Sequence, residues 1–350
     1  MPKPKKLCDT AGMDRATWLK VRAHGPDGSI PYAFGGSDVG VIMGVSSFKT
    51  AAELWYEKAG LLIPDDDANA GQKMMGHLME PIVAKLYAER TGNTIIEDTG
   101  LYQHPKYPFI LANLDYRFIR RSDRKEGVFD SKTTTYRKAM EWANGAIPPA
   151  YEMQIRTYMS VMDFMIGDLG ALWGNNPDAD FATPSLERNE VIEKMILDVV
   201  CEFEQSLHDN NPPSLTGVPS DLALKALARI IGKGDKKLPT VELGSKYRHK
   251  AVRIAALQEE VADLKEIVKK KEQEAGQLSV QICETMKAHE QGFIDAGKHE
   301  ILLHYVTRTT KRVDSDRFKK ELPEIHKKML KETHSRKLKV EMVAKKSAAS

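Results

Sequence analysis

The stretch GVFDSKTTT, at residues 127–135, places an acid and an ammonium group two positions apart at the end of a short apolar run. Residues i and i+2 of a β-strand point to the same face of a sheet, so Asp130 and Lys132 are predicted to share a face. A second acid, Asp115, lies in the preceding stretch LDYRF, and a polar turn separates the two stretches. Neighbouring strands joined in this way can bring the Asp115 and Asp130 carboxylates close together.

The chemistry that such a pair suits is metal binding. Two carboxylates within a few ångströms repel, and a cation between them allows both to stay ionised. Oxygen ligands of this kind favour Mg²⁺ or Mn²⁺. A lysine on the same face can hold a water or stabilise charge that develops on a phosphate. The pattern is short, and the residues taken alone favour an ordinary surface ion pair over a site.

The surrounding sequence predicts the elements that position these residues. Helical patterns cover residues 14–22, 39–43, 51–58 and 74–90. Strand candidates follow at residues 94–97, 100–104, 109–112, 114–119 and 127–133. A further strand at 168–173 lies among helices predicted at 136–144, 151–162 and 186–208. This order predicts an α/β fold with a mixed central sheet flanked by helices.

The second half of the chain has a different pattern. Apolar residues alternate at spacings of three and four from Leu243 to Ile282, with gaps at Lys250 and Lys271. This heptad pattern predicts either a parallel or antiparallel pairing of helices, or one long amphipathic helix packed on the body. Short strands are predicted after Gly292, followed by a basic helical region.

The C-terminal part of the chain is strongly basic. Residues 308–346 hold 14 Lys and Arg against 6 Asp and Glu, an excess of eight, which leaves the remainder near −5 because the whole chain is +3. A basic tail on a mildly acidic body indicates a polyanion partner, or else a solvated helical surface. We predict three parts: a catalytic domain at 1–212, a helical or coiled-coil region at 213–290, and a basic α+β segment at 291–350.

Composition excludes several classes of protein. The 350 residues are 41% hydrophobic and 29% charged, as in soluble globular proteins. No apolar run approaches the length of a membrane span, and the basic start MPKPKKL lacks the apolar segment of a secretory signal. The three cysteines are far apart and show no metal-ligand spacing, which fits the reducing cytoplasm.

Six motifs follow one another at plausible spacing over roughly residues 15–175: FGGSDVGVIMG, FKTAAELWYEKAG, GHLMEPIVAKLYAERTG, LANLDYRF, GVFDSKTTT and PPAYEMQIRTYMSVMD. In this order they resemble the YqaJ-type viral recombinase family, to which lambda exonuclease is related, within the PD-(D/E)xK nuclease superfamily. The family usually has Glu where this chain has Asp130. The superfamily pattern permits Asp there, so activity is still expected, with the metal set slightly differently.

The resemblance implies a role for each matching residue. It implies the catalytic residues Glu80, Asp115, Asp130, Lys132 and Gln154. It implies a site for two Mg²⁺ or Mn²⁺ ions held by Glu80, Asp115, Asp130 and the Ser131 carbonyl. It also implies contacts to DNA or to a 5′ phosphate from Arg22, Ser37 and Tyr158, since a hydroxyl, a guanidinium and loop N–H groups suit that anion.

The residues themselves allow two interpretations of the helical members of this set. Glu80 shares a helical stripe with small and apolar residues, where a carboxylate needs a partner such as a metal. Alternatively, it is a helix-start carboxylate, because Pro81 favours a first-turn position. Gln154 and Tyr158 lie one turn apart, which suits either the wall of a cleft or an ordinary surface pair.

The function implied by the resemblance is a metal-dependent 5′-to-3′ exodeoxyribonuclease that degrades one strand of linear duplex DNA in phage-type recombination. A ring-shaped homo-oligomer, a single-strand annealing partner and a bacterial host cell, with the protein encoded by the host or a phage, belong to the same expectation. One alternative is another endonuclease or repair nuclease of the superfamily. Another is a non-catalytic DNA-binding or scaffold protein, against which the intact set of Glu80, Asp115, Asp130 and Lys132 argues.

Overall fold

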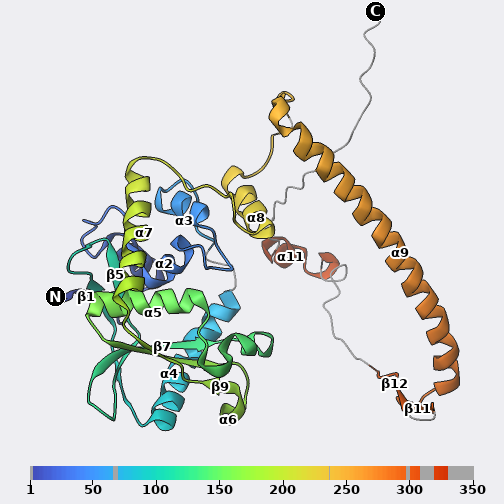
Figure 1. The fold of residues 1–350 in the computed structure, drawn as a ribbon, viewed down its shortest axis with the longest axis horizontal. Coiled ribbons are helices and arrows are strands. Elements are labelled where there is room, and N and C mark those ends of the chain that lie inside the picture. The colour runs from blue at the N-terminus through green and yellow to red at the C-terminus, as the bar shows by residue number, and fades with distance from the viewer. Residues whose placement is uncertain (1–2, 66–69, 236, 297–299, 308–318, 330–350) are drawn as a thin grey trace, which may run out of the picture. The chain divides into compact units, whose positions relative to one another are not determined.

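The computed structural model describes residues 3–65, 70–235, 237–296, 300–307 and 319–329. The chain divides into two compact units, Met1–Gly232 and Lys233–Ser350, which are described separately below (Figure 1). Within the described ranges, none of the helices combines the length and the apolar character that a membrane span requires.

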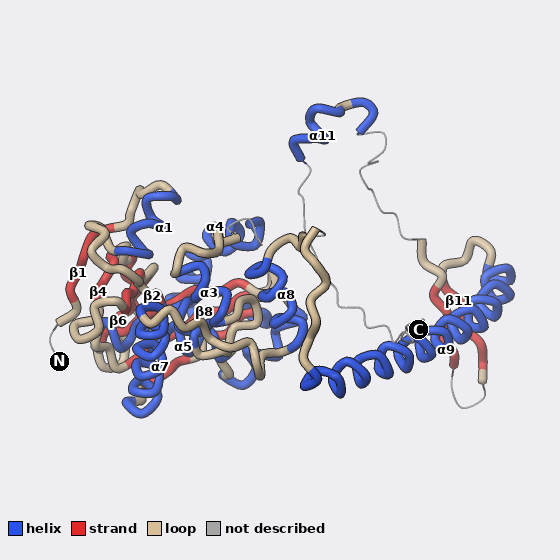
Figure 2. Tube along the Cα trace, turned by 90° about the horizontal axis from the view of Figure 1, so that it is seen from above, coloured by secondary structure: helices blue, strands red, loops and turns tan. Residues whose placement is uncertain are grey.

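Two β-sheets form the centre of the first unit (Figures 1 and 2). Their strands are β1 Lys5–Asp9, β2 Phe34–Gly35, β3 Thr94–Glu97, β4 Gly100–Gln103, β5 Ile110–Asn113, β6 Tyr116–Ile119, β7 Glu126–Thr133, β8 Ile166–Leu172, β9 Phe181–Ala182 and β10 Ser185–Glu187. The larger sheet has the order β10-β8-β7-β6-β3, with β9 paired to β8, and the smaller has the order β1-β4-β5-β2. Strands β7 and β8 are parallel, as are β2 and β5, so each sheet is mixed. The predicted mixed α/β class is confirmed, with two sheets in place of one.

Helices flank these sheets: α1 Arg15–His24, α2 Gly36–Ile42, α3 Ala51–Lys58, α4 Ala70–Thr91, the 3-10 helix η1 Tyr136–Gly145, α5 Pro149–Met162, α6 Pro177–Asp180, α7 Glu190–His208 and α8 Ser220–Ile231. The helix predicted at 51–58 is confirmed at both ends. Its start is defined by a capping box, in which Thr50 and Glu53 bond each other's backbone N–H groups.

One prediction about the end of the first unit is corrected. The helix predicted at 186–208 begins at Glu190, because Ser185–Glu187 pairs with β8 and the Asn189 side chain caps the helix. Helix α8 falls in the region predicted as helical or coiled coil at 213–290, although it was not predicted as a separate element.

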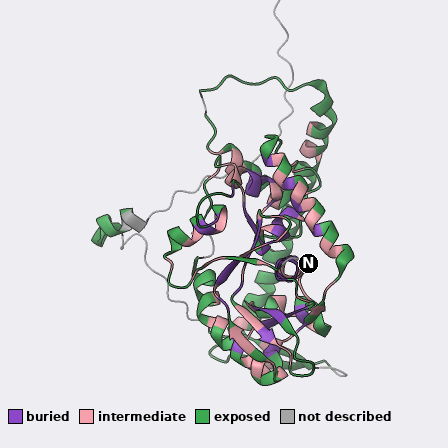
Figure 3. Ribbon diagram, turned by 90° about the vertical axis from the view of Figure 1, so that its left-hand side faces the viewer, coloured by how far each residue is buried: buried purple, intermediate pink, exposed green. Residues whose placement is uncertain are grey.

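Strand β7 divides its side chains between two hydrophobic cores. Figure 3 colours the buried segments of the chain purple. Val128 packs with Ile155 of α5, whereas Phe129 packs with Val83 and Tyr87 of α4. Helices α5 and α4 therefore cover opposite faces of the larger sheet. By the alternation of a strand, Asp130 and Lys132 continue the face of Val128.

Two glycines of β8 allow both helices to lie close to the sheet. A Cβ on Gly167 would lie 2.5 Å from Ile155 Cγ2 of α5, and one on Gly170 would lie 2.8 Å from Val83 Cγ1 of α4. Real Cβ atoms do not approach other carbon atoms so closely, so any side chain at either position would push a helix away from β7. These glycines therefore help to set the distance between the helices and the strand that carries Asp130.

Asp115 lies outside the strand in which it was predicted. Strand β6 begins at Tyr116, and Asp115 occupies the bend that precedes it. The strand predicted at 114–119 is shorter because the chain crosses at this point from β5 of the smaller sheet to β6 of the larger one. The acid therefore stands at the junction of the two sheets and is exposed on one side.

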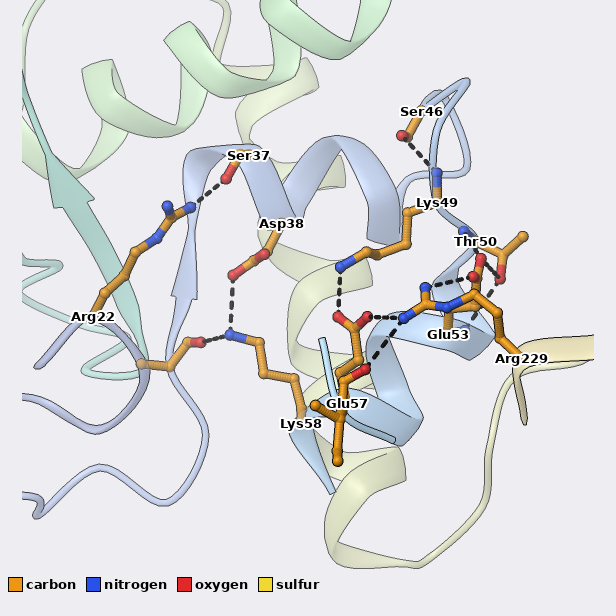
Figure 4. Close-up of polar contacts among 12 residues, drawn as sticks. Arg22, Ser37, Asp38, Ser46, Lys49, Thr50, Glu53, Glu57, Lys58 and Arg229 are labelled. Atoms are coloured by element: carbon orange, nitrogen blue, oxygen red, sulfur yellow. Dashed lines mark hydrogen bonds and ion pairs between the residues drawn. The ribbon is translucent and has the colours of Figure 1, made fainter. Parts of the chain in front are cut away.

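Helix α8 is tied to α3 by a buried charge network (Figure 4). Arg229 of α8 donates to Glu53 Oε1 at 2.9 Å and to Glu57 Oε1 at 3.3 Å. The Lys49 ammonium also reaches Glu57, at 2.5 Å. Because the side chains of Glu53 and Glu57 are only 4% and 6% exposed, Arg229 neutralises carboxylates that water reaches poorly. Helix α8 is therefore part of the first unit.

The second unit contains one long helix and a hairpin. Helix α9, Arg248–Met286, has 39 residues and follows a 3-10 turn, η2 Ser245–Tyr247; β11 Gln291–Asp295 pairs with β12 Glu300–His304, and α11 is Pro323–Met329. The predicted helix and short strands are confirmed. Heptad side chains such as Leu257, Val261 and Leu264 are exposed, so the pairing of α9 with another helix stays a prediction. Most of the basic tail at 308–346 lies outside the described residues.

Candidate active site

Asp130 and Lys132 share a face of β7, as predicted, and form an ion pair between Oδ2 and Nζ. Asp130 is 3% exposed, and the Lys132 side chain is 17% exposed. Burial lowers the pKa of Lys132, but the Asp130 carboxylate outweighs that effect and raises it overall. Although Asp130 Oδ2 touches the ammonium, it is buried and has no hydrogen bond of good geometry. The pair is therefore close, but it does not satisfy the carboxylate.

Asp115 lies near Asp130. It precedes the β6–β7 hairpin, whose first pair is Tyr116 with Phe129, the neighbour of Asp130. Burial by surrounding protein raises the pKa of Asp115 to about 7, and the Asp130 and Glu80 carboxylates add to the rise. The residue nevertheless keeps an exposed side, which fits a carboxylate in the wall of an open site.

Glu80 reaches the same site from α4. Pro81 lies inside this helix of 22 residues and not in its first turn, so the interpretation of Glu80 as a helix-start carboxylate is wrong. His77, one turn earlier, has Nδ1 2.9 Å from Glu80 Oε1, and its charge lowers the pKa of Asp115. The sequence interpretation missed His77, although its i, i+3 spacing from Glu80 is a usable signal.

The acidic residues fit a hard divalent cation in charge and in ligand type. The cation would be held by Glu80, Asp115 and Asp130, with the Ser131 carbonyl beside them on β7. A positive charge there would relieve the repulsion that raises the Asp115 pKa, and it would satisfy Asp130 Oδ2. As they stand, however, the residues that the structure describes contain no closed cluster of three or more His, Cys, Asp or Glu ligands. In this arrangement Asp130 is engaged by Lys132.

The raised pKa of Asp115 predicts that the free energy of unfolding depends on pH. The unfolded chain loses the Asp115 proton near pH 3.8 and the folded metal-free protein near pH 7, a raised pKa. The resulting stabilisation is complete below pH 3.8 and is lost as the pH rises through 7. Since Asn does not ionise, Asp115→Asn in EDTA should unfold about 2 °C above wild type at pH 8, a value reduced for solvent screening, and level with it at pH 3.5. Thermal unfolding at both pH values checks this, and equal midpoints at pH 8 would contradict the raised pKa.

Gln154 and Tyr158 line the α5 side of the site. Gln154 Nε2 donates to the Tyr158 hydroxyl at 3.1 Å, and Tyr158 is only 7% exposed, so the interpretation as a surface pair is wrong. Burial raises the pKa of Tyr158 to about 12, and the Asp130 charge adds to the rise, whereas Arg22 opposes it. A Cβ on Gly36 would meet Tyr158 Cε1 at 2.7 Å, so the α2 start presses against this tyrosine.

Arg22 and Ser37 meet at the start of α2 (Figure 4). The Arg22 guanidinium donates to the Ser37 hydroxyl and lies 5.1 Å from the Trp18 ring centroid. Asp38 is next in the chain; burial opposes its ionisation, but Lys58 at 3.0 Å and Arg22 lower its pKa. Arg22 is thus held among the glycine-rich turn, the Trp18 face and a carboxylate. Through Tyr158, this second group adjoins the carboxylates of β7.

Comparison with known proteins agrees with the motif order. Residues 17–165 match the family described as the YqaJ-like viral recombinase domain. The chain is 27% identical over 341 residues to the uncharacterized protein YqaJ of Bacillus subtilis strain 168, which covers 97% of this chain and 98% of that protein.

Solved exonuclease structures are also similar to part of the chain. The alkaline exonuclease LHK-Exo of Laribacter hongkongensis has a TM-score of 0.44 and 19% identity over 55% of this chain and 92% of its own. A phage related exonuclease of Haemophilus somnus 129PT has a TM-score of 0.37 and 15% identity over 50% and 93%. By its family match, residues 17–165 of this chain form a YqaJ-like viral recombinase domain.

Proposed function

We propose that this protein is a metal-dependent exodeoxyribonuclease that removes nucleotides from a 5′ end of linear duplex DNA. The observation that carries the proposal is the proximity of three carboxylates and one ammonium: Asp130 and Glu80 both act on Asp115, and Lys132 pairs with Asp130. Three carboxylates and one ammonium suit hydrolysis of a phosphodiester.

The residues divide the work as follows. Glu80, Asp115, Asp130 and the Ser131 carbonyl would hold Mg²⁺ or Mn²⁺, which supplies charge stabilisation and a more acidic water when bound. Lys132 stabilises negative charge that develops on the phosphate and orients the attacking water. Gln154 and Tyr158 form the wall next to the reacting strand. Arg22 and Ser37 hold the terminal phosphate.

A direct test compares linear with covalently closed circular duplex, each with Mg²⁺ and with EDTA. Loss of the linear substrate alone, and only with Mg²⁺, supports the exonuclease. Cutting of closed circles would favour an endonuclease of the same superfamily. DNA binding without cleavage in either Mg²⁺ or Mn²⁺ would favour a scaffold protein. Substrates labelled at one end establish the direction.

The proposal extends to the assembly. Duplex DNA is the substrate, and a ring of identical subunits with a single-strand annealing protein as partner belongs to the same pathway of recombination. The exposed heptad positions of α9 supply a surface on which subunits or partners can pair.

Arg22→Ala tests the phosphate pocket. Without the guanidinium, digestion of 5′-phosphorylated ends should slow about tenfold, whereas digestion of 5′-hydroxyl ends should change little. Arg15→Ala is the matched control, because Arg15 also lies against Trp18, with Cζ 4.8 Å from the ring centroid. Equal slowing on both kinds of end, measured as initial rates, would assign Arg22 another role.

Truncation tests the division of labour between the units. A chain that ends at Gly232 should fold and keep metal-dependent cleavage, while the slope of log affinity for DNA against log salt becomes shallower because basic groups are lost. An unchanged slope of log affinity against log salt would mean that the tail does not bind DNA.

A chain that ends at Asn211 also loses Arg229. Its unfolding free energy should fall by about 2 kcal/mol, which is less than for a fully buried pair because Arg229 is partly exposed. Arg229→Met in the full chain is the control for the charge.

A further inference from the structure

Lys132 has a second neighbour that the proposed reaction leaves unused. Its Nζ lies 5.0 Å from the ring centroid of Tyr151, in the first turn of α5. Trp142 of η1 stacks on that ring, with the centroids 5.6 Å apart and the planes inclined by 22°. Trp142 is 2% exposed, so the main hydrophobic core fixes its position. The phenol of α5 therefore lies beside both the ammonium of β7 and the indole of η1.

The ion pair with Asp130 cannot be the whole support for Lys132 in a working site. Asp130 Oδ2 is the atom that contacts the ammonium, and the same carboxylate is the one that would hold a cation. An oxygen engaged by a divalent ion attracts an ammonium far less. Lys132 would then remain a poorly exposed charge without its counter-ion, and such a charge is costly to bury.

An aromatic face meets this need. It attracts an ammonium through the negative charge of the ring, and it uses no carboxylate oxygen to do so. Its attraction is also unaffected when Asp130 changes partner. The stacked indole of Trp142 favours the orientation of the Tyr151 ring that faces the ammonium.

We propose that Tyr151 is a positioning residue, which holds the Lys132 ammonium in place by its ring while Asp130 is engaged elsewhere, and that Trp142 holds the ring. The proposal rests on the proposed function in that it assigns Lys132 a part in hydrolysis. The ring carries the role and the hydroxyl does not, because the contact is with the ring centroid.

Kinetics with two variants test the proposal. Tyr151→Leu should lower the single-turnover rate on saturating linear duplex about tenfold and leave KM unchanged. A tenfold loss of rate corresponds to the loss of one desolvated cation–π contact. Tyr151→Phe, which keeps the ring, should stay within about twofold of wild type. Tyr107→Leu is the matched control, because Tyr107 is also partly buried and has an ammonium, Lys106 Nζ, 5.2 Å from its ring. It should leave the rate unchanged.

A second measurement needs neither metal nor DNA. In protein with ¹³C-labelled lysine, the Lys132 ε-methylene protons should be shifted upfield by the ring current, with the signal assigned by its loss in Lys132→Arg. The shift should disappear in Tyr151→Leu and persist in Tyr151→Phe. A wild-type rate in Tyr151→Leu, an equal loss in both Tyr151 variants, or an unmoved Lys132 signal would overturn the proposal. If wild type itself does not cleave, the proposed function fails, while the NMR comparison still decides whether Tyr151 positions the lysine.

Discussion

Asp115→Asn is expected to reduce cleavage of linear duplex to background, a loss of at least about 10³-fold, which exceeds the effect of removing one preorganised donor. The charges of Asp130 and Glu80 both act on Asp115, so Asp115 is the carboxylate that lies near each of the other two. Asn retains the size of the side chain but removes the negative charge that attracts a cation. The remaining acids should then bind Mg²⁺ too weakly to support the reaction.

The measurement is single-turnover cleavage over a Mg²⁺ titration, with metal binding followed by calorimetry. Asp123→Asn is the control, because Asp123 lies in the turn of the same hairpin and pairs with Arg120 at its far end. Loss of activity cannot be attributed to unfolding if the variant is at least as stable as wild type, as expected in EDTA at pH 8. A rate near wild type at saturating Mg²⁺ would mean that Asp130 and Lys132 form a buried ion pair with no part in cleavage.

Lys132→Ala is expected to act on the chemical step. The single-turnover rate should fall by about 10²-fold or more, the effect of losing one preorganised charge-stabilising group. Mg²⁺ should bind at least as tightly as in wild type, because Asp130 Oδ2 is released from the ammonium. DNA binding should persist, since the other basic groups of the chain are unchanged.

The control for this variant is Lys125→Ala, which removes an exposed ammonium that pairs with Asp123 before the start of β7. Calorimetry and a DNA-binding titration accompany the kinetics of both variants. Weakened Mg²⁺ binding in Lys132→Ala would mean that the lysine supports the ligands and not the phosphate. The two site variants thereby separate the role of Asp115 from that of Lys132.

The sequence by itself determined the features that depend on neighbouring residues. The Asp130–Lys132 face follows from the alternation of a strand, and helix 51–58 follows from its capping box. The mixed α/β class follows from the order of the elements. The family motifs identified the recombinase domain because their residues keep one order along the chain.

Only the tertiary structure decided the features that depend on contacts between distant segments. Asp115 stands in a bend because the chain changes sheets there, and no pattern within LDYRF signals that crossing. Helix α8 belongs to the first unit because Arg229 neutralises two acids of α3, far away in the chain. Tyr151 meets Lys132 because α5 packs across β7. The periodicity of the sequence indicates on which face of its own helix or strand a residue lies. The packing of helices and strands against one another decides which of those side chains come into contact.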